Sequence, residues 1–238
     1  MNKTQVLSNL KRHWHLLLYP IFFLAASPIM EALNHPIGQV RDLAINLDDL
    51  IPFVPQFVLI YHSWMPSLLL LAVGFLLFAI KKNEKSGNLR QSADILFYRR
   101  YCLALIFGQA YAHLTFPFFQ TFVTRHPFDQ APVNIFEQLV SLTYKVDNPY
   151  CGFPSIHVLT SCLAIFFVMR SSFKKIYRYL IALHFSLIIA STLLIKQHVF
   201  WDLPGGLLYA ILGYLSLPFA EKLADRVEML FTRRRKPS

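Results

Sequence analysis

The chain has 238 residues, of which 55% are hydrophobic and 15% are charged, against roughly 25% charged residues in a typical soluble domain. This composition excludes an ordinary soluble protein and a disordered one, and it indicates a polytopic membrane protein. No polar linker interrupts residues 1–238, so we expect a single domain. The formal net charge of +10 could indicate a nucleic-acid partner, but the distribution of the basic residues, described below, argues against one.

Six apolar stretches dominate the chain. A helix needs about 20 mostly apolar residues to cross the hydrocarbon core of a bilayer. In chain order the stretches are Trp14–Leu33, Phe57–Ile80, Phe97–Phe119, Ser155–Met169, Tyr177–Ile195 and Leu203–Phe219. The sequence therefore predicts an all-α fold with six transmembrane helices.

The basic residues predict the orientation of these spans. Of the 23 Lys and Arg residues, 19 fall in four segments that alternate with the other loops: Met1–His13, Lys81–Arg100, Arg170–Arg178 and Lys222–Lys236. Cytoplasmic loops carry the excess of Lys and Arg, so both termini are expected in the cytoplasm. The net charge is then a topology signal, and we expect the membrane surface as the partner of the basic tail and no nucleic acid.

The first apolar stretch has a second interpretation. Lys11 and Arg12 precede an apolar run that ends near Ala25–Ser27, as in a cleavable signal peptide. Pro20 breaks this run, and the basic region before it is long, so a retained first span is preferred. Either interpretation leaves the remaining loops on the same sides of the membrane.

Four polar residues meet at the outer ends of the predicted spans. His157 begins the fourth span, and His198 and Asp202 lie at the junction of the fifth and sixth. Arg125 lies in the loop after the third span. Ionisable groups near a membrane interior are costly to hold and by default mark a functional site. The sequence therefore predicts one site on the extracytoplasmic side.

The residue types and spacings at this site indicate a chemistry. His198 and Asp202 are four residues apart, which on a helix places a carboxylate one turn from an imidazole and holds one tautomer. Such a histidine can attack phosphorus or accept a proton. Pro154-Ser155 reads as a helix start, where Ser155 caps the helix and the first-turn N–H groups, beginning at Ile156, bind anions.

Together these residues suit cleavage of a lipid phosphoester at the headgroup level. His198 would form a phosphohistidine, Asp202 would stabilise the cationic ring, and His157 would protonate the leaving alcohol. Arg125 would hold the phosphate bidentately. The scheme needs no metal, and we expect no cofactor.

The same residues resemble two motifs of the type-2 phosphatidic acid phosphatase superfamily. The third motif, S-R-x-x-x-x-x-H-x-x-x-D, is matched by Ser191, His198 and Asp202, with Thr192 in place of Arg. The second motif, P-S-G-H, is present as Pro154–His157, with Ile in place of Gly. This resemblance implies a helical membrane phosphatase with those residues in the catalytic roles given above.

The first motif, K-x-x-x-x-x-x-R-P, matches only loosely at Arg125, which stands in Arg-His-Pro with Phe118 at the Lys position. The resemblance covers roughly residues 97–219, the expected catalytic core. Because the third motif lacks its Arg, we expect Lys196, four residues after Thr192, to supply the charge from the same helical face.

The departures from these motifs resemble the sphingolipid synthase and inositol phosphorylceramide synthase branch. Members of that branch transfer the phosphoryl headgroup to a second lipid alcohol. The stretch Ile51–Phe57, with Tyr61 and Trp64, also resembles an early block of the branch.

The preferred prediction is a lipid phosphatase, since water needs no acceptor pocket, with a lipid phosphate as substrate. A lipid phosphotransferase is the first alternative, and a non-catalytic transporter or scaffold is the second. Polar residues scattered at mid-span would favour transport, whereas here they gather at one face. The membrane would be a bacterial inner membrane or a eukaryotic secretory-pathway membrane.

Overall fold

The computed structural model describes residues 14–82, 92–128 and 132–233. These residues are mostly helical, as expected for an all-α protein, and their only strands are β1 (Arg41–Asp42) and β2 (Thr121–Phe122). In chain order the helices, with η for 3₁₀ turns, are η1 (Trp14–Leu17), α2 (Leu18–Ala25), α3 (Ser27–Leu33), α4 (Asn46–Leu50), η2 (Pro55–Phe57), α5 (Val58–His62), α6 (Trp64–Lys82), α7 (Ala93–Thr115), α8 (Ile135–Val146), α9 (Ile156–Arg170), α10 (Lys175–Leu194), α11 (Asp202–Leu215) and α12 (Leu217–Arg233).

Each of the six predicted apolar stretches coincides with helix, and three of them are broken. The first is divided into η1, α2 and α3, and the second into η2, α5 and α6. The sixth ends at Ser216, where α11 and α12 meet at a bend of 55°. Breaks of this kind escape a prediction based on apolar length, because the length of an apolar run does not indicate where the helix within it is interrupted.

Two helical segments of the described residues are long and apolar enough to cross a membrane, namely Pro55–Lys82 and Lys175–Leu194. The bent pair α11 and α12 adds a third if it forms one span. Helix α7 is 23 residues long but carries charge in its first turns, where Arg99 pairs with Asp225 and Arg100 with Glu221.

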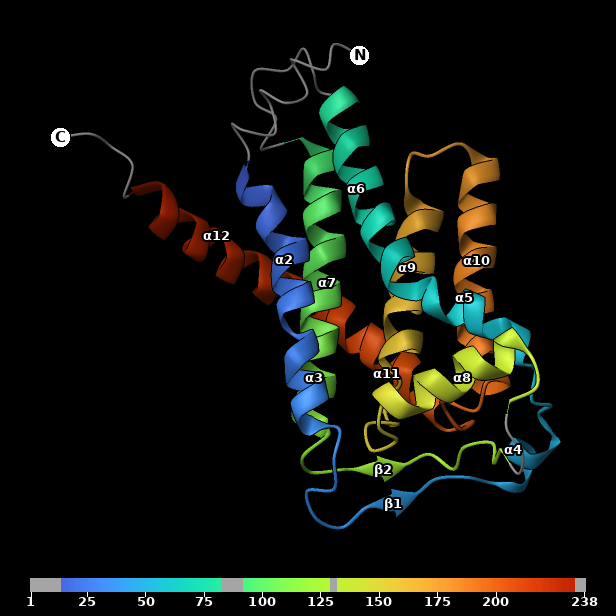
Figure 1. Cartoon of the computed structure of the whole chain (residues 1–238). Coiled ribbons are helices and arrows are strands. Elements are labelled where there is room, and N and C mark those ends of the chain that lie inside the picture. The colour runs from blue at the N-terminus through green and yellow to red at the C-terminus, as the bar shows by residue number, and fades with distance from the viewer. Residues whose placement is uncertain (1–13, 83–91, 129–131, 234–238) are drawn as a thin grey trace.

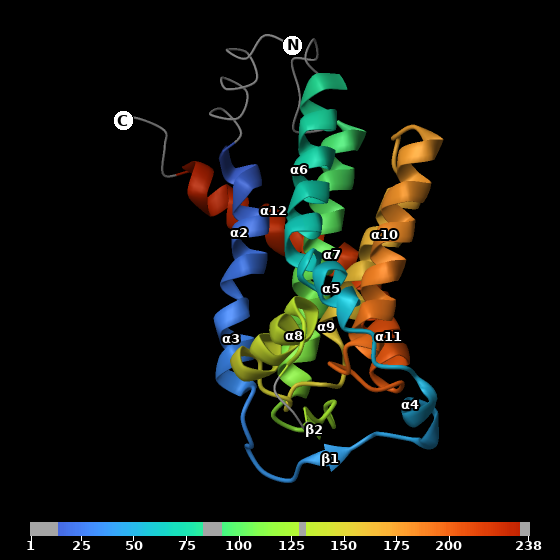
Figure 2. The ribbon, with the colours of Figure 1, turned by 45° about the vertical axis from the view of Figure 1, so that its right-hand side comes forward.

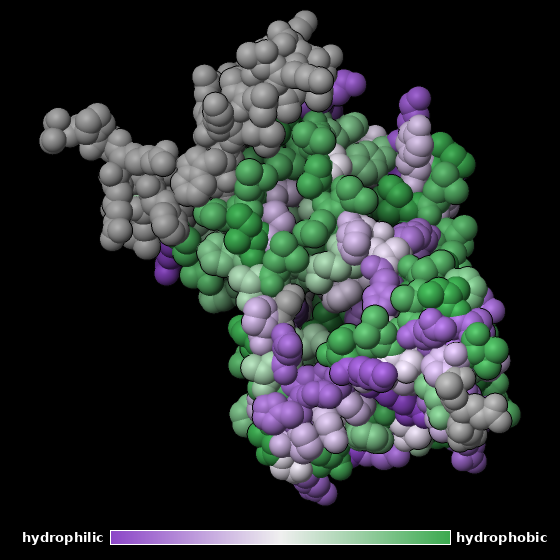
Figure 3. Space-filling view, in the orientation of Figure 1, coloured by the Kyte–Doolittle hydropathy of each residue, from purple (hydrophilic) through white to green (hydrophobic). Residues whose placement is uncertain are grey.

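The helices form a bundle around α7, which contacts α2, α6, α9, α11 and α12. Figure 1 and Figure 2 show α2 and α3 stacked end to end on one side of α7, and α10 on the other side, beyond α9. Helices α4 and α8 and the strands form a layer across one end of the bundle. Figure 3 shows apolar side chains over the helical part and more polar ones toward this layer.

Helix α8 in this layer was not expected from the sequence. Asn134 caps it by accepting hydrogen bonds from the backbone N–H groups of Phe136 and Glu137. Val140 is buried on one face, whereas Leu142 is exposed on another. At 12 residues the helix is too short to span a membrane, so a search for spans passes over it.

The strands tie the layer together. β1 pairs with β2 in parallel, with Arg41 opposite Thr121, and Thr121 also bridges to Cys151. Thr121 Oγ1 accepts a hydrogen bond from the backbone N–H of Phe153 at 2.8 Å. These contacts fix the segment that leads into α9, and so position the residues at its start.

A glycine decides how closely α11 approaches the start of α9. A Cβ at Gly206 would lie 2.6 Å from Val158 Cβ and 2.8 Å from the carbonyl oxygen of Ser155. Gly206→Ala is therefore expected to lower the free energy of unfolding by about 1–3 kcal/mol through overpacking, measured as thermal unfolding in detergent. Gly74→Ala is the matched control, since its Cβ meets only Phe173 Cζ at 3.7 Å; equal stability of the two variants would contradict the expectation.

Candidate active site

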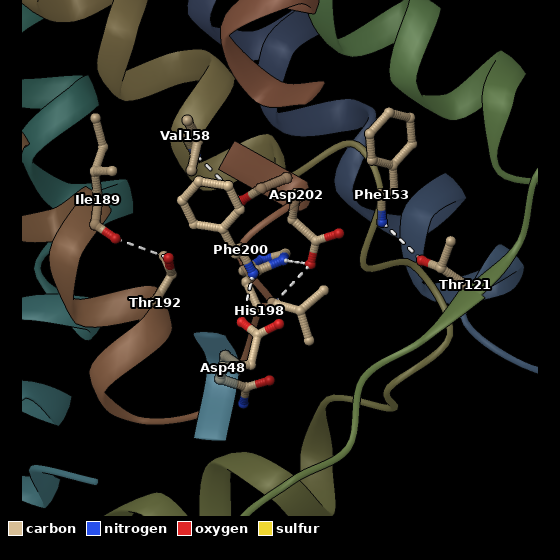
Figure 4. A network of polar contacts seen from close by, with 12 residues as sticks. Asp48, Thr121, Phe153, Val158, Ile189, Thr192, His198, Phe200 and Asp202 are labelled. Carbon is tan, nitrogen blue, oxygen red and sulfur yellow. Dashed lines mark hydrogen bonds and ion pairs between the residues drawn. The ribbon is translucent and has the colours of Figure 1, made fainter. Parts of the chain in front are cut away.

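His198 and Asp202 form a buried pair, although no continuous helix joins them. His198 lies in the turn between α10 and α11, and Asp202 is the first residue of α11. Asp202 Oδ2 accepts hydrogen bonds from His198 Nδ1 at 2.9 Å and from the backbone N–H of Val199 at 3.1 Å. The side chains are 8% and 0% exposed. Figure 4 shows the carboxylate directed at the imidazole.

The turn before His198 is a helix C-cap of the Schellman type. The backbone N–H of Lys196 donates to Leu193 O, and that of Gln197 donates to Thr192 O, which is the pattern of this motif. Lys196 occupies the left-handed position with φ of 54°, where glycine is usual. This cap turns the chain out of α10 and brings His198 back over the end of the helix.

The contact with Asp202 decides the tautomer of His198. A carboxylate only accepts hydrogen bonds, so Nδ1 of His198 carries the proton and Nε2 keeps its lone pair. The nitrogen free to attack an electrophile is therefore Nε2. The carboxylate also stabilises positive charge on the ring when Nε2 is substituted.

His157 lies beside His198, with their ring centroids 5.7 Å apart. It is the second residue of α9 and is 8% exposed. Its ring lies against two aromatic rings, those of Tyr61 at 4.5 Å and Trp64 at 4.0 Å between centroids. Trp64 Nε1 in turn donates to Thr160 Oγ1 at 2.7 Å, so the imidazole is held in a fixed orientation.

Ser155 caps α9, as expected, by accepting a hydrogen bond from the backbone N–H of Val158 at 3.3 Å. Its own N–H donates to the backbone carbonyl of Asp202 at 3.4 Å. Ser155 thereby joins the two histidine-bearing segments directly. Ile156, at the first position of the helix, lines a cavity together with His157 and His198.

His198 lines two cavities. The smaller cavity, of ≈ 20 Å³, is also lined by His157, Asp147 and Gln197. The larger, of ≈ 560 Å³, is lined on the other side by Asp49, Arg125, His126 and Lys196 among others. The paired imidazole therefore stands between a tight cleft and an open pocket, each lined by both polar and apolar residues.

Comparison with protein families gives one match, to the PAP2 superfamily of type-2 phosphatidic acid phosphatases, over residues 50–216. The chain belongs to the PAP2 superfamily. Comparisons with curated proteins and with solved structures give no match. Members of the PAP2 superfamily are usually phosphatases or phosphotransferases, and the matched region contains every predicted site residue.

Arg125, the candidate for the first PAP2 motif, reaches the site from the loop after β2. Its Nη1 donates to the backbone carbonyl of Tyr144 at 2.7 Å, and its Nη2 donates to that of Asp147 at 2.5 Å. Nη2 also lies 3.1 Å from Gln197 Oε1. Burial lowers the pKa of the Arg125 guanidinium, and Asp147 opposes that shift.

Lys196 lies at the pocket but not along the face of α10 that its spacing from Thr192 suggested. Helix α10 ends at Leu194, and the left-handed residue turns the side chain toward the segment before α5. Its Nζ donates to the backbone carbonyls of Asp48 and Ile51 at 2.7 and 2.6 Å. Burial lowers the pKa of the Lys196 ammonium, whereas Asp48 and Asp49 raise it.

These contacts predict a role for Lys196 in binding. An ammonium has three donors, so one remains for a phosphate in the larger pocket. We expect Lys196→Met to raise KM for a lipid phosphate about tenfold, the loss of one charge-assisted hydrogen bond. Steady-state kinetics beside Lys145→Met, which removes an exposed lysine, checks this; an unchanged KM would contradict it.

Several polar residues of the site were missed from the sequence, among them Asn34, Asp147 and Gln197. All three line the smaller cavity, and Asn34 Nδ2 donates to Asp147 Oδ1 at 2.8 Å. Burial raises the pKa of the Asp147 carboxyl, while Arg125, His198 and Asn34 act in the opposite direction. Gln197 could have been suspected from the sequence, since it directly precedes His198. Asn34 and Asp147 are far from His198 in the sequence and reach the site only through tertiary contacts.

No group of three or more His, Cys, Asp or Glu side chains suited to a metal ion occurs in residues 14–82, 92–128 and 132–233.

Proposed function

We propose that this PAP2 protein is an integral membrane lipid phosphatase that needs no metal and acts through a phosphohistidine. The observation that carries the proposal is the buried pair of His198 Nδ1 and Asp202 Oδ2, 2.9 Å apart, with the ring of His157 5.7 Å away. This arrangement supplies a nucleophile with a fixed tautomer and an adjacent proton donor, as phosphoryl transfer through histidine requires.

In the first step, Nε2 of His198 attacks phosphorus and the bond from phosphorus to the leaving alcohol oxygen breaks. His157 gives its proton to that oxygen. Asp202 stabilises the positive charge on the phosphorylated ring of His198. In the second step, His157 takes the proton of a water molecule, whose oxygen attacks phosphorus, and the bond from phosphorus to Nε2 breaks.

The phosphoryl oxygens would be held from several directions. The first-turn N–H groups of α9, beginning with Ile156 and capped by Ser155, lack partners within the helix and carry the positive end of its dipole. Lys196 would donate from the larger pocket, and Arg125 would add positive charge from behind Gln197. The preference of helix N-termini for phosphate supports the first of these assignments, and the positive charge of Lys196 and Arg125 suits the charge of the phosphoryl oxygens.

For the membrane topology we propose six spans with both termini in the cytoplasm and the site on the extracytoplasmic side. Helix α2 begins, and helix α12 ends, on the side of the bundle away from β1 and β2 (Figure 1), which supports placing both termini on the same side of the membrane. We further propose one domain over residues 1–238, with the catalytic residues drawn from residues 97–219. The membrane is a bacterial inner membrane or a eukaryotic secretory-pathway membrane.

A lipid phosphotransferase is the second candidate, and the larger cavity favours it. A pocket of ≈ 560 Å³ against His198, lined by Asp49, His126 and Lys196, has room for a polar headgroup or an acceptor alcohol. Asp49 is exposed there, and a carboxylate can accept hydrogen bonds from hydroxyl groups. In this case His157 would take the proton of a lipid hydroxyl in place of water.

The experiment that separates these candidates identifies products by mass spectrometry. Purified protein in mixed micelles is given a panel of lipid phosphates and lipid alcohols, with the His198→Ala variant treated in parallel. Free phosphate and dephosphorylated lipid, both absent with the variant, would identify a phosphatase. A phosphorylated form of an added lipid alcohol, absent with the variant, would identify a transferase.

Two outcomes would contradict an enzymatic function of this site. Equal product from the wild type and the variant would exclude His198 as the nucleophile. No product from either protein across the panel would favour the transporter or scaffold interpretation.

A further inference from the structure

The side chain of Gln197 holds a hydrogen-bond donor that the fold leaves without a partner. Gln197 is 4% exposed and lines the ≈ 20 Å³ cavity that His157 and His198 also line. Its Nε2 is buried and has no hydrogen-bond partner among the residues that the structure describes. Buried amide groups are nearly always satisfied, so a donor left open at a functional site indicates a ligand that completes it.

Arg125 decides which way this amide faces. A guanidinium carries only donors, so the atom of Gln197 that lies 3.1 Å from Nη2 is the acceptor Oε1. The guanidinium itself is fixed by the backbone carbonyls of Tyr144 and Asp147. The NH₂ group of Gln197 is therefore turned away from Arg125 and held in one orientation.

The position that carries Arg in the third PAP2 motif cannot supply this donor. Thr192 stands there, and its Oγ1 donates back to the carbonyl of Ile189 at 2.8 Å (Figure 4). Two of the Lys196 donors are engaged by backbone carbonyls at the edge of the larger pocket. The smaller cavity has about the volume of one water molecule, which is also the size of a single phosphoryl oxygen.

We propose that Gln197 Nε2 donates a hydrogen bond to a non-bridging oxygen of the phosphoryl group while His198 attacks phosphorus. Arg125 is then a positioning residue that acts through the Gln197 amide. The inference rests on the proposed function, and it assigns the donor that the altered third motif lacks. A fixed donor aimed at the oxygen on which charge develops stabilises the transition state more than the ground state.

The test measures binding of orthovanadate, which mimics a phosphoryl group under attack, to the purified full-length protein in detergent. The readout is the vanadate concentration that gives half of the maximal thermal stabilisation. Gln197→Met removes the donor, whereas Gln197→Glu keeps an acceptor for Arg125 and replaces the donor by a carboxylate oxygen. Gln138→Met, at an exposed position of α8, is the matched control, and His198→Ala tests the site itself.

We expect Gln197→Met to weaken vanadate binding about tenfold and Gln197→Glu to weaken it at least as much, with Gln138→Met unchanged. Turnover of the substrate found in the product assay should fall about 10²- to 10³-fold in Gln197→Met, as for loss of one oxyanion donor. If Gln197 served only to hold Arg125, Gln197→Glu would bind vanadate like the wild type, and the inference would be overturned.

The remaining outcomes separate the inference from the proposed function. Vanadate binding that is lost in His198→Ala but equal in both Gln197 variants and the wild type overturns the inference and leaves the function standing. Absence of vanadate stabilisation in the wild type overturns both. Should Gln197→Met fail to fold, Gln197→Glu still decides, because it retains the contact with Arg125.

Discussion

Substituting alanine for His198 is expected to lower turnover about 10⁵-fold, in the range seen when an enzyme loses its covalent nucleophile. Nε2 of His198 is the nitrogen that attacks phosphorus, because Nδ1 is committed to Asp202 Oδ2 at 2.9 Å. The imidazole of His157 is not placed to take over this role, since its ring lies against Tyr61 and Trp64. Initial rates on the substrate found in the product assay measure the loss.

A second measurement identifies the role of His198 independently of rate. Radiolabelled phosphate should be trapped on the wild-type protein as an acid-labile, base-stable adduct, and none should be trapped on His198→Ala. His35→Ala, at an exposed histidine, should behave as the wild type in both assays. An adduct of unchanged amount on His198→Ala would show that another residue is the nucleophile.

Replacing His157 with alanine is expected to lower turnover of a lipid phosphate by about 10²- to 10⁴-fold, the usual contribution of a general acid. The loss should be much smaller for 4-nitrophenyl phosphate, because nitrophenolate departs without a proton. The ratio of the two rates therefore reports on proton donation by His157 rather than on folding. Rates on both substrates, measured side by side, give this ratio.

The Asp202→Asn variant is the control for this prediction, because it should affect the two substrates equally. Asp202 contacts His198 and the backbone N–H of Val199, so it acts on the nucleophile and not on the leaving group. We expect Asp202→Asn to slow both substrates by similar factors. Equal losses for the two substrates in His157→Ala would mean that His157 positions His198 and does not protonate the leaving oxygen.

Local patterns were sufficient for most of the helices. Apolar runs of 15 to 24 residues predicted six helical stretches, and helix is present in all six. Ser155 was expected as a cap from the step Pro154-Ser155, and it accepts the hydrogen bond from Val158. Such signals act within a few residues of the chain, so the sequence alone carries them. The number of spans and their orientation stay predictions.

Contacts between segments that are distant in the sequence could not be predicted from local sequence patterns. A search for long apolar runs also missed the break at Ser216 and the 12-residue helix α8. Asn34 and Asp147 are 113 residues apart and meet by a side-chain hydrogen bond. Asp48 accepts from the backbone N–H of Phe200, 152 residues away, and fixes the far side of the His198 turn.

For the candidate site, local patterns predicted which residues carry reactive groups, because the spacing of His198 and Asp202 and the helix start before His157 are local features. The surroundings of these residues depend on the folded chain. In the fold, the Arg125 guanidinium donates hydrogen bonds to two backbone carbonyls and to Gln197 Oε1. Lys196 Nζ donates to the backbone carbonyls of Asp48 and Ile51. The physical reason is that a buried donor takes the acceptors nearest in space, and in a folded chain most of these come from elsewhere in the sequence.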